Sequence, residues 1–349
     1  MLEREKIERL LVRATNWLGD AVMSLPALGA IRQNFPKARI TMLALDWVAE
    51  LYRREGLVDE ILRYPDRRGL GDWRLKWRLA GELSRRRFDA AILLQNAFEA
   101  ALIAWLARIP IRLGYDRDGR KMLLTHPIPV PRPGEIPRHE SFYYLELLRR
   151  AGVGPPLPKQ ALIRFTSADQ ARQIGRERLD LLGFSGDVIG VSPGAAYGDA
   201  KRWLKERFAQ AAIELARKLP AQVAIFGAKN ERLLCEAVAE IVRSAGIRCE
   251  NFAGRTSLGE FMDLVAACRL MLTNDSGAMH VASALGVPTV TIFGPTDPLA
   301  TGPTGPLAKI VREPVDCSPC LRRTCPIDHR CMTRVSVERV VDVAIELLG

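Results

Sequence analysis

Residues 270–293 read LMLTNDSGAMHVASALGVPTVTIF, and this stretch decides the predicted fold. The apolar run Leu270–Asn274 has the length of a buried strand, Gly277–Leu285 has helical spacing, and Thr289–Phe293 is again strand-like. A strand, a helix and a second strand in close succession predict a βαβ unit with two parallel strands. The polar turn at 274–277 would then lie at the carboxyl edge of the sheet, where open α/β sheets bind ligands.

The same alternation of strands and helices runs through most of the chain and is interrupted once. A proline-rich segment, 126–138, predicts a loop, and Gly152–Pro158 (GVGPPLP) predicts a linker. The alternation resumes at the strand Asp187–Val191. A chain of 349 residues is long enough for two cores. We therefore predict an α/β protein of two Rossmann-like parallel-sheet domains, residues 1–155 and 156–349, which face a cleft.

The composition is that of a folded globular protein, with 48% hydrophobic and 26% charged residues. The first ten residues, MLEREKIERL, are too charged for a secretory signal peptide. The longest apolar stretch, 90–107, is interrupted by Gln95, Asn96 and Glu99, which argues against a transmembrane helix. We expect a cytoplasmic protein, at most attached to the inner face of a membrane.

The positive charge is concentrated in the first half of the chain. Residues 1–160 contain 28 Lys and Arg against 19 Asp and Glu, whereas residues 161–349 contain 23 against 21. Such asymmetry favours an anionic partner for the first half: nucleic acid, anionic lipid headgroups or phosphorylated sugars. A solvated arginine-rich surface is the simpler alternative.

The seven cysteines fall into two groups. Three lie in apolar, periodic surroundings that predict buried thiols: Cys235, Cys249 and Cys268. The other four form the pattern Cys317-x2-Cys320-x4-Cys325-x5-Cys331. Its first half matches a zinc half-site and its second half does not, so a zinc site and reduced free thiols both stay open.

Common nucleotide motifs are absent from the sequence. Neither a P-loop nor a G-x-G-x-x-G segment occurs, which disfavours a P-loop NTPase and a standard NAD dehydrogenase. The pair Asp116-x-Asp118 matches the D-x-D of metal-dependent sugar transferases. A match of this length arises often by chance.

Polar residues follow the predicted strands at four loops. In the first loop, Gly19 permits a tight turn and Asp20 begins the next helix, as a general base or as a carboxylate favoured by the helix dipole. The second loop, 192–203, contains small residues that allow close approach of a ligand, with Lys201 and Arg202 as charges suited to phosphate. An ordinary flexible loop is the alternative there.

The third loop, 273–280, joins a strand to a helix whose free N–H groups attract anions. Ser276 can cap that helix or donate to a ligand, and His280 is either packed or in contact with ligand. The fourth loop, 293–298, would border the same region.

Together these loops resemble those of the ADP-heptose:lipopolysaccharide heptosyltransferases, glycosyltransferase family 9. The motifs that match occur in the same order along nearly the whole chain. They are Gly19-Asp20, Ser192-Pro193-Gly194 with Lys201-Arg202-Trp203, Asn274-Asp275-Ser276-Gly277 with His280, and Phe293-Gly294-Pro295-Thr296.

The resemblance implies a GT-B fold, with the acceptor on the N-terminal domain and the nucleotide sugar on the C-terminal domain. It implies that Asp20 is the general base and that Lys201 holds the diphosphate. The expected donor site also includes Ser192, Gly194, Arg202, Glu231, Asp275, Ser276, Gly277 and His280. The segment 317–331 is similar to the tail loop of many heptosyltransferase II sequences.

The implied reaction is an inverting transfer of heptose from ADP-heptose to the lipopolysaccharide inner core, with no metal and no cofactor. Another GT-B transferase with a different donor, such as a UDP-sugar, is one alternative. A basic nucleic-acid-binding protein is the other, and it needs exposed aromatic residues among the basic ones. Trp73 and Trp77 lie there, but their spacing predicts the buried side of a helix.

Overall fold

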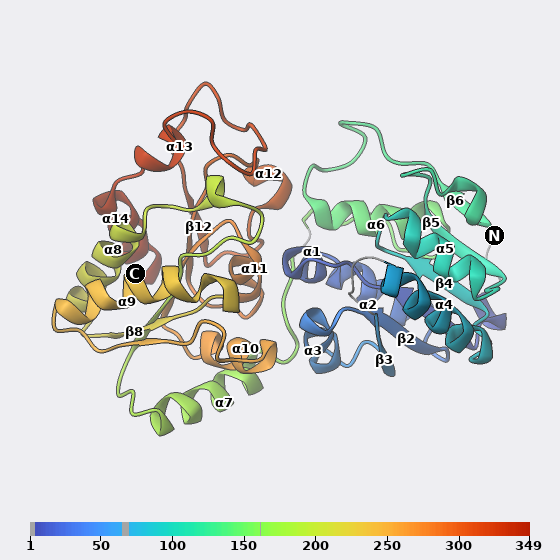
Figure 1. Cartoon of the computed structure of the whole chain (residues 1–349), viewed down its shortest axis with the longest axis horizontal. Helices are drawn as coiled ribbons and strands as arrows, with labels where there is room; N and C mark the ends of the chain where they lie inside the picture. Colours follow the sequence, from blue (N-terminus) through green and yellow to red (C-terminus); the bar gives the residue numbers. More distant parts are fainter. Residues whose placement is uncertain (1–3, 65–69, 161) are drawn as a thin grey trace. The chain divides into compact units, whose positions relative to one another are not determined.

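The chain folds into two compact units, residues 1–161 and 162–349, in a computed structural model that describes residues 4–64, 70–160 and 162–349 (Figure 1). The division comes six residues after the boundary placed at 155/156 from the sequence. Each unit is described below by itself.

Unit 1 is built on a sheet of six parallel strands in the order β3-β2-β1-β4-β5-β6. The strands are β1 (Arg9–Arg13), β2 (Arg39–Ala44), β3 (Glu60–Arg63), β4 (Ala90–Leu93), β5 (Ile111–Tyr115) and β6 (His126–Ile128). The helices are α1 (Leu18–Met23), α2 (Leu25–Asn34), α3 (Asp46–Arg54), α4 (Leu70–Arg85), α5 (Phe98–Leu106) and α6 (Glu140–Arg150).

Unit 2 repeats this plan, because its sheet has the order β12-β11-β10-β7-β8-β9 and is also parallel throughout. Its strands are β7 (Val188–Ser192), β8 (Gln222–Ile225), β9 (Cys249–Asn251), β10 (Leu270–Asn274), β11 (Thr289–Ile292) and β12 (Ala308–Val311). Its helices are α7 (Ala168–Leu181), α8 (Lys205–Lys218), α9 (Arg232–Ser244), α10 (Leu258–Ala266), α11 (Gly277–Ala284), α12 (Pro298–Thr301), α13 (Arg330–Thr333) and α14 (Val337–Leu348).

In each sheet the strand order reverses between two central strands. The reversal lies between β1 and β4 in unit 1 and between β7 and β10 in unit 2. The predicted α/β class and its two Rossmann-like sheets are therefore confirmed. Ligands of such sheets bind beyond the carboxyl ends of the strands at this reversal.

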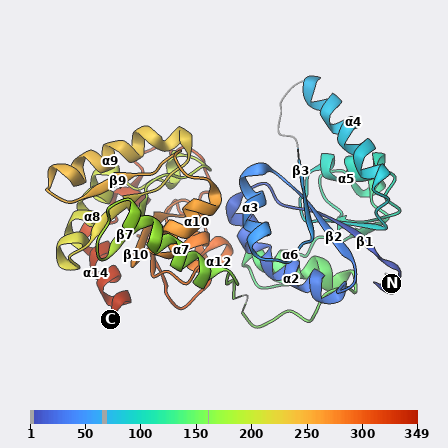
Figure 2. The ribbon, with the colours of Figure 1, turned by 90° about the horizontal axis from the view of Figure 1, so that it is seen from below.

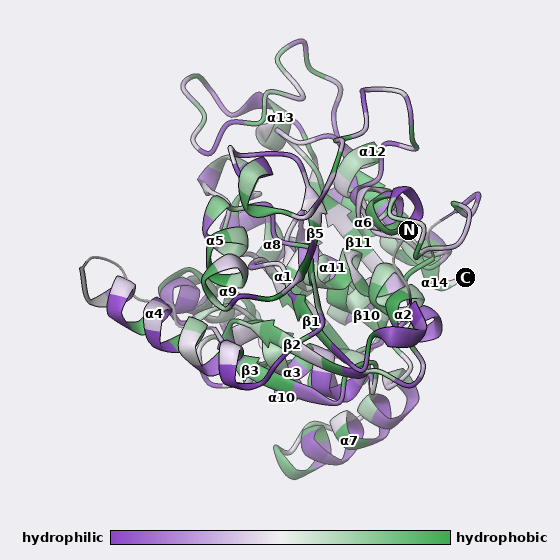
Figure 3. Ribbon diagram, turned by 90° about the vertical axis from the view of Figure 1, so that its right-hand side faces the viewer, coloured by the Kyte–Doolittle hydropathy of each residue, from purple (hydrophilic) through white to green (hydrophobic). Residues whose placement is uncertain are grey.

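The central strands are apolar because helices cover both faces of each sheet. Every residue of β4, β7 and β10 is buried, and Figure 3 shows hydrophobic residues concentrated in the strands. The predicted thiols Cys235, Cys249 and Cys268 are buried, as expected. No helix in the described parts of the chain is long and apolar enough to cross a bilayer.

Several expectations from the sequence are wrong in detail. The segment 126–138 was predicted as a loop, yet β6 begins within it. Pro127 is tolerated there because β6 is an edge strand. The helix that was expected to begin at Asp20 is in fact two helices, α1 and α2, divided at Ser24. Trp73 and Trp77, predicted to be buried, are 47% and 59% exposed.

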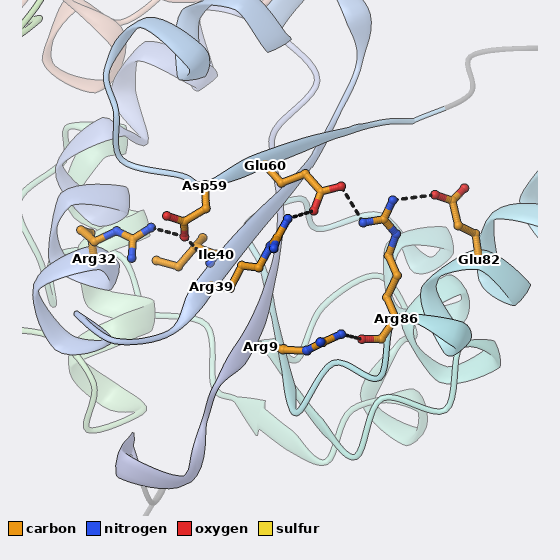
Figure 4. Close-up of polar contacts among 8 residues, drawn as sticks. All are labelled: Arg9, Arg32, Arg39, Ile40, Asp59, Glu60, Glu82 and Arg86. Atoms are coloured by element: carbon orange, nitrogen blue, oxygen red, sulfur yellow. Dashed lines mark hydrogen bonds and ion pairs between the residues drawn. The ribbon is translucent and has the colours of Figure 1, made fainter.

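An ion-pair network fixes the edge of the unit 1 sheet (Figure 4). Glu60 on β3 accepts hydrogen bonds from Arg39 on β2 and from Arg86, which directly follows α4. Arg86 also pairs with Glu82 within α4. The carboxyl end of α4 is therefore tied to the sheet through charged side chains as well as through apolar packing.

Candidate active site

The candidate loops of both units follow the central strands at the reversals. The Asp20 loop follows β1, and the loops beginning at residues 193 and 275 follow β7 and β10. Strand order alone therefore places the predicted catalytic and donor-binding loops where this architecture binds ligands.

A buried ion pair joins the two loops of unit 2. Lys201 Nζ lies 2.6 Å from Asp275 Oδ2, and the two residues are 9% and 3% exposed. Thr296, from the loop after β11, donates to the same oxygen at 2.6 Å. Lys201 Nζ also lies 4.9 Å from the centre of the Tyr197 ring. Asp275 thus orients the Lys201 ammonium group at a place where three loops come together. A positive charge in this position suits a diphosphate ligand.

The neighbouring Asn274 fixes the path of the second loop. Its side-chain amide donates to the Pro193 carbonyl at 2.8 Å, and its side-chain oxygen accepts from the Trp203 backbone N–H at 3.0 Å. Asn274 is fully buried. It therefore holds both ends of the loop that contains Lys201, a role that the sequence did not reveal.

Helix α11 begins at Gly277, two residues after Asp275. Ser276 is its N-cap, and its hydroxyl lies 3.3 Å from the Thr273 hydroxyl without capping the helix through its side chain. The backbone N–H groups in the first turn of an α-helix have no partner within the helix, so the start of α11 favours an anion. His280 lies one turn further along and is 6% exposed, so it is a packed residue of α11.

Gly194 is required by a close approach rather than by its dihedral angles. A Cβ at this position would lie 2.2 Å from the Glu231 carboxyl group. Glu231 accepts a hydrogen bond from the Ala228 backbone N–H at 2.9 Å. A carboxylate near the start of α9 is therefore packed onto the second loop, which brings two predicted donor-site residues together.

Ser192 and Arg202 complete the predicted set in unit 2. Ser192 is buried as the last residue of β7. Arg202 donates to the Ala195 carbonyl at 3.3 Å, and its Nε is buried with no acceptor among the described residues. Arg202 therefore anchors the loop that contains Lys201 through its own side chain.

The cysteine segment supports these loops. Tyr197 donates to the Leu321 carbonyl at 2.7 Å, and the Ala200 backbone N–H donates to the Arg323 carbonyl at 3.0 Å. Ser318 donates to the Gly294 carbonyl at 2.6 Å. Residues 317–331 therefore brace the second and fourth loops.

The four clustered cysteines do not form a metal site in this structure. Among the described residues, no group of three His, Cys, Asp or Glu side chains could hold a metal ion. Burial and then the neighbouring thiols of Cys317, Cys325 and Cys320 raise the pKa of Cys331 to about 11. Zinc binding and reduced free thiols both stay predictions for this segment. Asp116 and Asp118 instead lie in surface ion pairs with Lys121 and Arg117.

In unit 1, Asp20 lies in the first turn of α1 and shares its surroundings with a second carboxyl group. Glu140, the first residue of α6, has its pKa raised to about 7 by burial and by the charge of Asp20. Burial, and then the charge of Asp20, also raise the pKa of the Tyr144 hydroxyl. Two neighbouring carboxyl groups in different environments can take different protonation states, so that one acts as an ionised base while the other is neutral.

Unit 1 also contains two buried arginines that sequence reasoning missed. Arg13 is 3% exposed, contacts the Tyr64 ring and donates to Asn16 at 2.8 Å. Burial lowers its pKa to about 10. Arg120 is fully buried and donates to Asn96 at 3.0 Å. Their signal in the sequence was weak because both stand among many surface arginines.

A family comparison agrees with this geometry. The model of glycosyltransferase family 9 (heptosyltransferase) matches residues 76–330. The chain belongs to this family. It is therefore a glycosyltransferase, and the two parallel sheets match the GT-B fold of its solved members.

Similar proteins cover most of the chain. Lipooligosaccharide heptosyltransferase 2 of Haemophilus ducreyi is 32% identical, over 87% of this chain and 88% of its own. Lipopolysaccharide heptosyltransferase 2 of Escherichia coli is 31% identical with the same coverage. The structure of E. coli ADP-heptose LPS heptosyltransferase II superposes with a TM-score of 0.81, at 27% identity, over 97% of this chain and 98% of that one.

Proposed function

We propose that the protein transfers heptose from ADP-heptose to the lipopolysaccharide inner core and adds its second heptose. The support is the similarity of nearly the whole chain to proteins named heptosyltransferase 2, together with the loops assembled at both strand-order reversals. Unit 1, which was predicted from the sequence as residues 1–155, would bind the acceptor. Unit 2, assigned residues 156–349, would bind the nucleotide sugar.

The donor is held by charge and by backbone groups of unit 2. Lys201, oriented by Asp275, meets the diphosphate, and the N–H groups at the start of α11 add hydrogen bonds to it. Arg202, next to Lys201 in the same loop, adds a second positive charge. Glu231, packed against Gly194, accepts hydroxyl groups of the ribose.

The chemistry is a single displacement with inversion. Asp20 accepts the proton of the acceptor hydroxyl as its oxygen attacks the anomeric carbon through an oxocarbenium-like transition state. ADP leaves with increasing negative charge, which Lys201 stabilises. The pKa of Glu140 is raised to about 7 by burial and by the charge of Asp20, so Glu140 gives up its proton less readily than an ordinary carboxyl group, which favours Asp20 as the base.

The acceptor is a lipid-anchored glycan, so we also propose that the protein attaches peripherally to the inner face of the membrane. The excess of basic residues in the first half suits anionic lipids, core phosphates and acidic sugars. No role in nucleic-acid binding is needed to account for this charge.

The test is a transfer assay with two acceptors and two donors, with products identified by mass spectrometry. We expect transfer from ADP-heptose to an inner core that already carries one heptose, and no transfer to a core that carries none. Transfer to the heptose-free core would identify the first heptose as the product. Transfer from a UDP-sugar alone would contradict the donor assignment.

A further inference from the structure

The tryptophans are distributed unevenly between the two units. Tryptophan is normally well buried, and Trp203 of unit 2 follows that rule at 2% exposure. All five tryptophans of unit 1 are instead about half exposed: Trp17 53%, Trp47 50%, Trp73 47%, Trp77 59% and Trp105 48%. Exposed indoles at this frequency indicate a surface that meets another phase or molecule.

Helix α4 carries two of them in an inverted arrangement. A surface helix ordinarily buries its apolar residues and exposes its charges. In the first turns of α4 the opposite holds, because Asp72 and Lys76 are buried at 8% and 7% exposure. Lys76 forms ion pairs with Asp72 and with Glu99 of α5, while Trp73 and Trp77 face outward.

Arginines continue the outward face of α4. From residue 72 to residue 85, the exposed positions are Trp73, Arg74, Trp77, Arg78, Ser84 and Arg85. We call these six residues the Trp-Arg stripe. It contains no acidic residue, and none of its three arginines forms an ion pair with a described residue. The stripe therefore presents two indoles and three positive charges on one side of a single helix.

The position of α4 makes the stripe accessible to a flat partner. Figures 2 and 3 show the amino-terminal half of α4 extending away from the rest of unit 1. Its carboxyl end is tied to the sheet by Arg86 and Glu60 (Figure 4). A projecting convex helix lacks the groove in which a single nucleic-acid strand lies, but it can rest on a planar surface.

We propose that the Trp-Arg stripe of α4 docks unit 1 on an anionic lipid bilayer. Indoles are favoured at the level of the lipid headgroups, and arginines are attracted to anionic headgroups there. The inference rests on the proposed function in one respect, since a membrane-anchored acceptor requires the protein to reach the bilayer. The stripe supplies the attachment surface for that encounter.

The experiment measures flotation of the full-length protein with vesicles of phosphatidylcholine alone or with phosphatidylglycerol. We expect binding only to the anionic vesicles. Trp73→Ser/Trp77→Ser should weaken that binding about tenfold or more, since buried indole area is lost. Arg74→Gln/Arg78→Gln should weaken it about 30-fold, at roughly fivefold for each charge.

A matched control uses exposed apolar residues of unit 2. Leu181 and Leu233 are 88% and 87% exposed, and Leu181→Ser/Leu233→Ser should bind anionic vesicles as the wild type does. Circular dichroism should be unchanged in all three variants, and the melting temperature should fall only slightly, because the altered side chains are exposed or half exposed. Equal vesicle binding by the wild type and both stripe variants would overturn the proposal.

Turnover on a water-soluble, deacylated acceptor separates this proposal from the proposed function. Both stripe variants should keep wild-type turnover on that acceptor, since lipid contact is irrelevant to it. Loss of that turnover with intact vesicle binding would assign the stripe to the glycan and contradict lipid docking. Loss of binding to single-stranded DNA or RNA, with vesicle binding intact, would assign it to nucleic acid. Absence of any transfer by the wild type would contradict the proposed function alone.

Discussion

Lys201 is the residue that we propose to hold the diphosphate of the donor. Lys201→Ala removes a preorganised charge at the leaving diphosphate, so we expect turnover to fall about 10²–10³-fold and ADP to bind more weakly. It also leaves the buried Asp275 carboxylate with no positive charge opposite and with Thr296 as its remaining donor, which costs about 3–5 kcal/mol of stability. Calorimetry with ADP below the lowered melting temperature checks the binding effect. Unchanged ADP affinity would exclude the phosphate role, and Lys201→Arg should retain part of it.

Glu140 makes a prediction about pH. Its pKa is raised to about 7 in the folded protein, so ionisation is penalised by folding. The stabilising protonated form is fully present below the unfolded pKa, near 4.5, and its advantage is lost as the pH rises through 7. Glu140→Gln should therefore gain stability relative to wild type between pH 4.5 and pH 8, by at most about 3 kcal/mol. Denaturant unfolding across this range measures it, and a constant difference would contradict the raised pKa.

Gly194 tests the contact between the second loop and Glu231. A Cβ at this position would overlap the Glu231 carboxyl group, and one of the two must move. We expect Gly194→Ala to weaken ADP-heptose binding while the apolar core, and hence most of the stability, is kept. The control is Gly29→Ala, which should bind ADP-heptose normally because a Cβ at Gly29 has no neighbour within 4 Å. Gly246→Ala is unsuitable as a control because the positive φ of Gly246 would strain an alanine.

At the scale of elements, the sequence predicted most of the strands and helices because buried parallel strands are short apolar runs between helical segments. It missed the edge strands β9 and β12, which are short or partly exposed, and it read β6 as loop because of its proline. It also placed Trp73 and Trp77 on the buried side of α4, since helical spacing cannot tell which side faces the protein. The Lys201 loop was found from its composition, but its fixation by Asn274 depends on contacts between distant segments.

The proposed binding of the diphosphate by the Lys201 loop and the start of α11 predicts the effect of a metal chelator. Because Lys201 and the N–H groups of α11 meet the charge of the diphosphate, transfer should continue at an undiminished rate in EDTA. Rate measurements with and without the chelator decide this. Activity lost in EDTA and restored by Mg²⁺ or Mn²⁺ would bring Asp116 and Asp118 into the mechanism. Restoration by Zn²⁺ alone would assign a structural site to Cys317, Cys320, Cys325 and Cys331.

At the scale of the whole molecule, each of the two units is proposed to contribute a different part of the reaction. We propose that unit 2 holds the donor through Lys201, Asp275 and Glu231, and that unit 1 supplies the base and the basic surface. The charge asymmetry follows this division, since the excess of Lys and Arg lies almost wholly in residues 1–160. Substitutions in the two units should therefore separate donor binding from proton transfer.

The most direct test of this division is the turnover of Asp20→Asn at saturating ADP-heptose. The substitution keeps the shape of the side chain and removes its basicity. A positioned general base contributes about 10²–10⁴-fold, so we predict a fall of that size with near-normal ADP binding and melting temperature. A helix-dipole carboxylate would alter stability by only about 0.3–1 kcal/mol and leave turnover intact. Retention of more than about a tenth of wild-type turnover would contradict the assignment of Asp20 as the base.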